Sequence, residues 1–281
     1  MEHDHFVWRV GPHILDCRTR TYVMGVVNVT PDSFSDGGRF FDPETAVSRG
    51  LEMVSEGADI LDVGGESTRP GSGPVSVDEE RERVLPVIKR LAAETGVPLS
   101  IDTRKHEVAG AAIEVGATIV NDVTAASDPH MFRVVREGGA GMVLMHMRGE
   151  PKTMQAETDY DDVVADVKAY LAARVQAAVE AGVDWDRLAV DPGLGFAKTT
   201  AQSLRLMKET AAFLDLRRPV LVGPSRKSFI GDVLGTEVTD RLEGTAGAVA
   251  WMVTRGAHVV RVHDVKEIVR VVRVVDAIAR A

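Results

Sequence analysis

The stretch Val259-Val260-Arg261-Val262-His263 decides how this chain folds. It is short and rich in β-branched valine, which is typical of a strand buried on both faces, and it carries polar residues toward its end. A helical pattern with a valine-rich face follows at once, over Val265–Ala279. A strand that leads directly into a helix is the repeating unit of a parallel sheet.

The same unit recurs along the whole chain. Seven more apolar runs with polar ends precede it, at residues 23–29, 60–64, 99–103, 118–123, 142–146, 188–191 and 220–222. Eight such units in roughly 250 residues predict an α/β fold with one closed (β/α)8 barrel, a TIM barrel. An open doubly wound sheet shares the local pattern and is the alternative. Because no linker divides the chain, we expect a single domain over residues 1–281, with residues 1–20 as an N-terminal extension or hairpin.

Several helix boundaries can be predicted from local chemistry. Asp42-Pro43 offers an N-cap followed by a proline at the first helical position. Ser76-Val77-Asp78-Glu79 has the pattern of a capping box. Pro86 falls inside the helix that follows, and we expect it to kink or split that helix.

The bulk composition narrows the class of partner. A net charge of −9 disfavours a general attraction to nucleic acid or to anionic membranes, so neither partner is expected. The longest apolar runs fall far short of the ~20 residues that cross a bilayer, and the first residues lack a secretory pattern. The single cysteine, Cys17, permits no internal disulfide and fits a reducing cytoplasm, which is the location we expect.

Polar residues stand at the end of every predicted strand: Asn28, Asp62 with Glu66, Asp102, Asn121, His146, Asp191, Ser225 with Lys227, and Arg261 with His263. A single Asp or Asn in such a place is as readily explained as a helix cap. In a closed barrel, however, all eight positions converge on the rim where barrel enzymes keep their sites. We therefore expect a polar site on that rim.

The residue types on this rim suggest an anionic, ring-shaped ligand. Asp102, Asn121 and Asp191 would form a polar wall suited to the coplanar N–H groups of an amino-heterocycle. The stretch Ser225-Arg226-Lys227-Ser228-Phe229-Ile230-Gly231 places two cations and two hydroxyls within four residues, beside a buried strand. That density indicates a binding loop rather than a solvated turn.

An anionic group such as a diphosphate would need further cations, and Arg69, Arg261 and His263 supply them. Asn28 offers an oxygen that suits Mg²⁺, which leans on substrate phosphates, although a loop cap is an equally simple role for this residue. The loops at residues 30–42 and 64–76 are long and rich in Gly, Ser and Pro. Their place on the rim favours a closing lid over a plain surface linker.

Other site classes find less support in the sequence. The first predicted strand is not followed by a Gly-x-Gly-x-x-Gly motif, and the chain has neither a Walker A motif nor a zinc-ligand cluster. Ser225, His263 and an Asp could form a hydrolase triad, but the Gly-x-Ser-x-Gly elbow is missing.

Longer motifs resemble those of a known family. Asn28-Val29-Thr30-Pro31-Asp32-Ser33-Phe34-Ser35-Asp36-Gly37-Gly38 and Gly64-Gly65-Glu66-Ser67-Thr68-Arg69-Pro70-Gly71 are similar to the two signatures of the dihydropteroate synthases. Five shorter motifs follow in that family's order: Asp102-Thr103, Asn121-Asp122, Asp191-Pro192-Gly193-Leu194-Gly195-Phe196, Ser225-Arg226-Lys227-Ser228 and Arg261-Val262-His263. The likeness covers the chain from about residue 23 onward.

The resemblance implies a (β/α)8 transferase of folate biosynthesis. It would join 6-hydroxymethyl-7,8-dihydropterin diphosphate to 4-aminobenzoate, releasing diphosphate and forming 7,8-dihydropteroate, with Mg²⁺ as cofactor. It also implies a homodimer and a sulfonamide target. One departure is Leu194, where many members carry Phe; this apolar exchange would reshape the pocket wall without affecting the chemistry.

The resemblance also implies a role for each site residue. The pterin pocket would be Asp102, Asn121, Met145, Asp191 and Lys227. The diphosphate site would be Asn28, Arg69, Arg261 and His263, with Asn28 as the metal contact. The aminobenzoate pocket would be Thr68, Arg69, Pro70, Phe196 and Ser228. The catalytic residues would be Asp102, Lys227, Arg261 and His263.

Two other functions are compatible with these motifs. A related pterin-binding barrel that transfers a methyl group would keep Asp102, Asn121 and Asp191. It would have little use for the complete pair of motifs Thr68-Arg69-Pro70 and Ser225-Arg226-Lys227-Ser228. A non-catalytic paralogue would bind a ligand or partner without turnover, although such a chain tends to lose one of its site residues.

Overall fold

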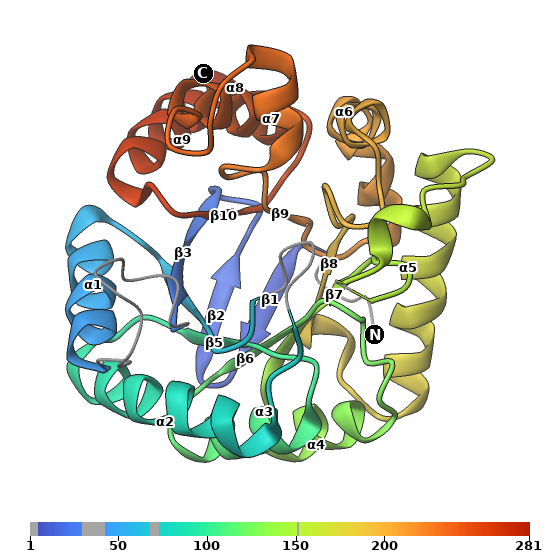
Figure 1. Ribbon diagram of the computed structural model, residues 1–281. Helices are drawn as coiled ribbons and strands as arrows, with labels where there is room; N and C mark the ends of the chain where they lie inside the picture. Colours follow the sequence, from blue (N-terminus) through green and yellow to red (C-terminus); the bar gives the residue numbers. More distant parts are fainter. Residues whose placement is uncertain (1–4, 30–42, 68–72, 151) are drawn as a thin grey trace.

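The computed structural model describes residues 5–29, 43–67, 73–150 and 152–281. Its main sheet has eight parallel strands in the order β8-β7-β6-β5-β4-β3-β10-β9 (Figure 1). The strands are β3 (Tyr22–Asn28), β4 (Ile60–Gly64), β5 (Leu99–Asp102), β6 (Ile119–Asp122), β7 (Gly141–Met145), β8 (Leu188–Asp191), β9 (Leu221–Val222) and β10 (Val259–Val262). A parallel bridge between Val190 and Val220 joins the two ends of this order, so the strands form a nearly closed barrel. The predicted fold class is confirmed, and the open sheet is excluded.

Helices surround the strands on the outside of the barrel (Figure 1). They are α1 (Pro43–Glu56), α2 (Val77–Glu94), α3 (His106–Glu114), α4 (His130–Gly138), α5 (Val163–Glu180), α6 (Thr200–Lys208), α7 (Ser228–Leu234), α8 (Leu242–Thr254) and α9 (Val265–Ala279). Within the described residues, three 3-10 turns lie between them: η2 (Met154–Ala156), η3 (Trp185–Arg187) and η4 (Thr210–Leu216). Each of the eight predicted strands begins and ends within one residue of the observed one. Continuous apolar runs covered on both faces leave little ambiguity in their boundaries.

An antiparallel hairpin fills the N-terminal mouth of the barrel. It consists of β1 (Val7–Val10) and β2 (His13–Asp16). Trp8 is fully buried in a cluster with Val10 and with residues from the first half of the strands, such as Met24 and Ile60. The Trp8 indole N–H also donates to the carbonyl of Arg187 at 2.9 Å. With this end filled by apolar side chains, the opposite, C-terminal end is where a ligand can enter.

The helix α2 departs from the sequence prediction at two places. It runs without a break through Pro86, so of the predicted kink or split the split is excluded. Pro86 lies on the exposed side of the helix, where water can hydrate the carbonyl that loses its partner, while Val84 and Leu91 bury the other face. Ser76 caps the helix by accepting from the Glu79 N–H at 3.2 Å, but the Glu79 carboxylate pairs with Arg83 instead of completing the box.

Candidate active site

Four polar side chains meet inside the barrel near the C-terminal ends of its strands. Arg261 of β10 donates from Nε to Asp62 Oδ2 at 2.6 Å and from Nη2 to Asp102 Oδ2 at 2.8 Å. Asn121 of β6 donates to the same Asp62 oxygen at 3.1 Å. Period-two alternation turns these residues inward on four strands that are far apart in sequence. The barrel therefore gathers Asp102, Asn121 and Arg261, which the sequence singled out, around Asp62.

For Asp62 the sequence predicts only a polar strand end, without a site role. Its side chain is fully buried between Arg261 and Asn121. Asp62 Oδ1 and Asp102 Oδ1 are also buried, and neither accepts a hydrogen bond from a described residue. Buried acceptors without a partner are uncommon in native proteins and point to donors supplied by a ligand.

Charge and burial shift the acidity of these groups in opposite directions. Burial raises the pKa of Asp102 to about 7, against the opposing effect of the Arg261 guanidinium. Burial also raises the pKa of Asp191 above its ordinary value, although Lys227 counteracts it. Burial would lower the pKa of Arg261, but Asp62 and Asp102 outweigh it and hold that pKa above its ordinary value. The site thus holds two carboxyl groups, Asp102 and Asp191, whose pKa values are raised by burial, beside a guanidinium that stays protonated.

Lys227 lies between the carboxylates and an aromatic ring. It follows β9, and its Nζ donates to the carbonyl of Leu194 and lies 4.4 Å from the centre of the Phe196 ring. Burial lowers the pKa of Lys227 to about 8, while Asp191 works against that shift. Ser228, the first residue of α7, is exposed beside it. Lys227 of this binding loop therefore interacts electrostatically with Asp191 and with the Phe196 ring.

The loop after β8 is held in place by hydrogen bonds and close packing. The Gly193 N–H donates to Asp191 Oδ1 at 2.7 Å with φ at +68°, and a Cβ atom at this residue would lie 2.0 Å from the carbonyl oxygen of His146. Only glycine fits there. Lys198, buried, donates to the Phe196 carbonyl at 2.8 Å and lies 3.0 Å from His146 Nδ1. Lys198 was not predicted, because nothing in the local sequence marks it as buried.

The remaining predicted residues lie in different surroundings. Met145, at the end of β7, is buried in a small apolar cluster with Met147 and Met154. His263 Nδ1 lies 3.0 Å from the Ser225 hydroxyl, which also accepts from the His263 backbone N–H at 3.2 Å. This pairing clamps the segment after β9 to the end of β10. Asn28 ends β3, partly buried, opposite Gly64.

Some predictions fall on parts of the chain that the structure does not describe. Thr68, Arg69 and Pro70, the proposed lid at residues 30–42 and most of the first signature lie outside the described residues. The N-cap expected at Asp42 does as well, although α1 begins at Pro43 as predicted.

One group of three possible metal ligands occurs among the described residues, and the sequence did not suggest it. It consists of His106, Glu107 and Asp128, with His106 Nδ1 2.6 Å from Asp128 Oδ2. These groups already pair with one another at the start of α3 and in the loop before α4.

Comparison with known proteins gives a consistent result. The family model described as "Pterin binding enzyme" matches residues 24–263. The dihydropteroate synthase of Synechocystis is 44% identical over 273 residues, covering 96% of this chain and 94% of its own length. The dihydropteroate synthase of Bacillus subtilis is 46% identical over 267 residues, covering 95% of this chain and 91% of its own length.

Solved structures agree in fold and in length. A dihydropteroate synthase of Xanthomonas albilineans with 4-aminobenzoic acid superposes with a TM-score of 0.92 at 45% identity, covering 99% of both chains. The same enzyme in complex with 7,8-dihydropteroate superposes with a TM-score of 0.89 at 43% identity, covering 98% of this chain and 99% of that chain. Together with the signatures and the polar rim, these matches show that the chain belongs to the dihydropteroate synthase family of pterin-binding enzymes.

Proposed function

We propose that this chain is a transferase that condenses 6-hydroxymethyl-7,8-dihydropterin diphosphate with 4-aminobenzoate to give 7,8-dihydropteroate and diphosphate. The observation that carries the proposal is the buried cluster of Asp62, Asp102, Asn121 and Arg261, which keeps two acceptor oxygens free inside the barrel. Related enzymes solved with 4-aminobenzoic acid and with 7,8-dihydropteroate support one of these substrates and this product.

The pterin ring would lie against the carboxylate wall. Its coplanar N–H groups would donate to Asp102 and Asp191, and Asn121 can both donate and accept. Lys227 would donate to a ring acceptor, and Met145 would cover an apolar part of the ring. Burial of these carboxylates makes each hydrogen bond to a ligand stronger than it would be in water.

The chemical step breaks the bond between the pterin methylene carbon and the diphosphate oxygen. Positive charge develops on the methylene carbon and the ring, and the Asp102 carboxylate would stabilise it electrostatically. The aminobenzoate nitrogen then forms the new C–N bond and releases one proton. No covalent bond to the protein is required at any stage.

The departing diphosphate needs cations on the rim. Arg261 uses Nε and Nη2 for Asp62 and Asp102, while Nη1 makes no hydrogen bond to a described residue. Nη1 can therefore bind a diphosphate oxygen without breaking the carboxylate contacts. We propose that His263 and Arg69 contribute as well; Arg69 lies outside the described residues.

A magnesium ion fits this rim only together with the substrate. Asn28 offers one amide oxygen, and Mg²⁺ commonly takes one or two protein ligands and completes its shell with phosphates and water. When bound, Mg²⁺ would neutralise charge on the leaving diphosphate. The residues that would hold the complex are Asn28 for the ion and Arg261 for the phosphate oxygens.

The second substrate would enter beside Lys227. The Phe196 ring lies 4.4 Å from the Lys227 ammonium, and Ser228 is exposed at the start of α7. We propose that Phe196 stacks on the aminobenzoate ring and that Ser228 binds its carboxylate. Thr68, Arg69 and Pro70 would complete this pocket, which is also the expected sulfonamide site.

Turnover is the direct test of this function. Purified protein with Mg²⁺ and both substrates should produce dihydropteroate and diphosphate in equal amounts. Binding of the pterin diphosphate without product would contradict the proposal and favour a non-catalytic paralogue. Transfer of a methyl group in place of this condensation would favour the related methyltransferase function.

The pH profile of the activity should be narrow and bell-shaped. Asp102 must be charged and Lys227 protonated, and their pKa values lie at about 7 and about 8. Below pH 7, Asp102 gains a proton and loses its charge; above pH 8, Lys227 loses its proton. We expect kcat/KM to peak between these values and to fall about tenfold per pH unit further out on each side.

Initial rates at low pterin diphosphate from pH 5 to pH 10 measure this profile. Lys227→Met should remove the alkaline limb and keep the acid one, which would assign the alkaline limb to Lys227. A wild-type profile that is flat from pH 6 to pH 9 would contradict the assignment.

We also propose a homodimer and a cytoplasmic location. Large apolar side chains are exposed on three neighbouring helices and the segment after α7: Val233, Leu234, Val238, Trp251, Val274 and Ile278. The helices α7, α8 and α9 lie next to one another (Figure 1), so a second copy could cover these side chains together. Analytical ultracentrifugation should give a mass of twice the 30.3 kDa chain mass. The Trp251→Glu variant should shift the measured mass toward that of a single chain.

Support for the cytoplasmic location comes from the single, buried Cys17. Among the helices that the structure describes, none has the length and apolar character needed to cross a membrane.

A further inference from the structure

The side chain of Lys198 is buried where the loops after β7 and β8 meet. It is only 3% exposed, and it belongs to the loop that joins β8 to α6. Its Nζ donates to the Phe196 carbonyl at 2.8 Å and to the His146 carbonyl at 3.4 Å, and it lies 3.0 Å from His146 Nδ1. Burial lowers the pKa of His146 to about 3, so its imidazole is neutral at pH 7 and Nδ1 can accept from Lys198. Three acceptors on two loops therefore converge on one nitrogen.

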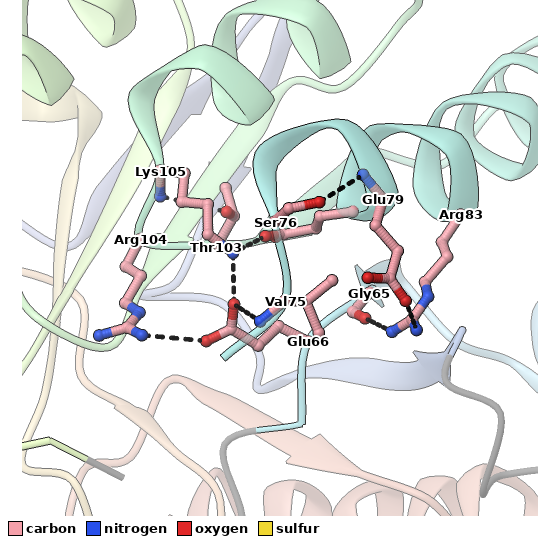
Figure 2. Close-up of polar contacts among 10 residues, drawn as sticks. Gly65, Glu66, Val75, Ser76, Glu79, Arg83, Thr103, Arg104 and Lys105 are labelled. Atoms are coloured by element: carbon pink, nitrogen blue, oxygen red, sulfur yellow. Dashed lines mark hydrogen bonds and ion pairs between the residues drawn. The ribbon is translucent and has the colours of Figure 1, made fainter. Parts of the chain in front are cut away.

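Lys198 pairs with no carboxylate among the described residues. The partly buried Lys105 shows the more usual arrangement: it bonds to the carboxylate of Glu66, as Figure 2 shows, and to that of Glu80. Burial lowers the pKa of Lys198 well below its ordinary value. A buried amine without a counter-ion is costly, and a side chain that only filled the space would be apolar. The role of Lys198 is therefore to be sought in the two loops that its nitrogen joins.

The backbone next to Lys198 has a strained conformation. Ala197 is fully buried and has φ at +49°, a left-handed value that is unfavourable for a residue with a Cβ atom. Lys198 bonds the carbonyl of the residue before Ala197, and the Tyr160 hydroxyl donates to the Ala197 carbonyl at 3.1 Å. Such conformations persist only where surrounding contacts hold them, and they cluster at functional sites. Lys198 and Tyr160 supply these contacts.

The same loop carries two groups of the proposed site. The Phe196 ring lies 4.4 Å from Lys227 Nζ, and the Leu194 carbonyl accepts from that nitrogen. Phe196 is the residue proposed to stack on the aminobenzoate ring, and its carbonyl is the one that Lys198 bonds. Because this carbonyl is held, the Phe196 ring has a defined place beside Lys227.

We propose that Lys198 is a positioning residue for the second substrate. By joining the Phe196 carbonyl to His146, it sets the Phe196 ring where 4-aminobenzoate is to stack. Lys198 acts through Phe196 and does not itself contact the substrate. The inference rests on the proposed function, because it concerns the binding of 4-aminobenzoate.

The test is the Lys198→Met variant, which keeps an unbranched side chain and removes its N–H donors. The KM for 4-aminobenzoate should rise about tenfold, since a positioning error of about 1 Å can cost up to about a hundredfold and the loop keeps its other hydrogen bonds. The KM for the pterin diphosphate should change less than about threefold, because Asp102 and Asn121 belong to β5 and β6. The matched control is Lys208→Met, at the exposed end of α6, which should leave both KM values unchanged.

A double variant tests whether Lys198 acts through Phe196. Phe196→Ala removes the ring and should by itself raise the KM for 4-aminobenzoate. Adding Lys198→Met should raise this KM by less than about a further twofold, because the ring that Lys198 positions is already absent. A further rise of about tenfold would show that the two residues act independently, and it would overturn the inference.

Hydrogen exchange tests the positioning without requiring turnover. The Phe196 N–H donates to the Gly193 carbonyl at 3.2 Å, and the Gly195 N–H donates to Ser203 Oγ at 3.2 Å. Both amides should exchange about tenfold faster in Lys198→Met, while amides of β8 keep their rates. Equal rates in the two proteins would contradict the inference. If the wild-type protein formed no dihydropteroate, the proposed function would fail, and these rates would still decide whether Lys198 holds the loop.

Two kinetic results would also overturn the positioning role. One is a lower melting temperature in Lys198→Met with both KM values at the wild-type level, which would mark the lysine as purely structural. The other is an equal rise in the KM of both substrates. Circular dichroism of each variant confirms that the barrel is folded before kinetics are compared.

A second variant serves if Lys198→Met does not fold. His146→Phe removes the ring nitrogen that lies 3.0 Å from Lys198 Nζ and keeps an aromatic ring in its place. It should raise the KM for 4-aminobenzoate about threefold or more, because Lys198 loses one of its acceptors. An unchanged KM in this variant would count against the role of Lys198.

Discussion

The Asp102→Asn substitution is expected to lower kcat by about a hundredfold to a thousandfold while the barrel stays folded. The amide has nearly the shape of the carboxylate, and its oxygen can still accept from Arg261 Nη2, as Asp102 Oδ2 does at 2.8 Å. What it lacks is the negative charge that would face the developing cation. The acid limb of the pH profile should disappear in the same variant, because the group with a pKa of about 7 is gone.

Folding should not limit this experiment. The wild-type carboxylate carries a desolvation cost, which is why its pKa is raised, and the neutral amide avoids that cost. We therefore expect a melting temperature equal to or above that of the wild type. Steady-state kinetics at saturating substrates give the change in kcat. The control is Asp59→Asn, at the opposite end of the barrel, where Asp59 accepts from Arg20 at 2.7 Å. A kcat within threefold of wild type would remove Asp102 from the chemical step.

The Arg261→Met substitution is expected to cost about 3–5 kcal/mol of stability at pH 7.5, because it leaves buried carboxylates without their cation. Arg261 bonds Asp62 at 2.6 Å and Asp102 at 2.8 Å, and the Asp62 side chain is fully buried. Urea unfolding measures the decrease in the free energy of unfolding. The control is Arg226→Met, which removes a guanidinium paired with Asp264 at 3.0 Å but 44% exposed, and it should cost less than about 1 kcal/mol.

The loss in Arg261→Met should shrink as the pH falls. Without Arg261 the pKa of Asp102 rises further above the value of about 7, and above the 3.8 of the unfolded chain. The folded state then binds more protons than the unfolded state between these values, so stability decreases as the pH rises. The variant should be closer to wild type at pH 5 than at pH 7.5. A loss below about 1 kcal/mol at both pH values would show that Arg261 does not compensate these carboxylates.

The same variant should also lose activity. With Asp102 protonated at neutral pH, the negative charge proposed to stabilise the cation is absent, and the Nη1 donor proposed for diphosphate is absent as well. Raising the pH should recover only part of the rate, because the diphosphate contact is not restored. A kcat/KM close to wild type at pH 7.5 would contradict both roles.

The barrel and most of its polar rim followed from the sequence by itself. Strands buried on both faces are continuous apolar runs, so the local sequence is enough to predict their number and their limits. The predicted bounds of β4 and β8 match the observed ones residue for residue. Closure of eight parallel strands brings every strand end to one rim, and this placed Asp102, Asn121 and Lys227 together. The two long signatures indicated the family to which the chain belongs.

Contacts between distant residues were decided only by the tertiary structure. Arg261 lies 199 residues from Asp62 and 159 from Asp102, and no local pattern states which carboxylate a cation will reach. The burial of Lys198 against His146 depends on two separate loops. Pro86 stayed within a continuous helix because tertiary packing on the opposite face outweighs one missing hydrogen bond. Periodicity records which face of an element is apolar; the partner of a buried charge is set by how the elements close around it.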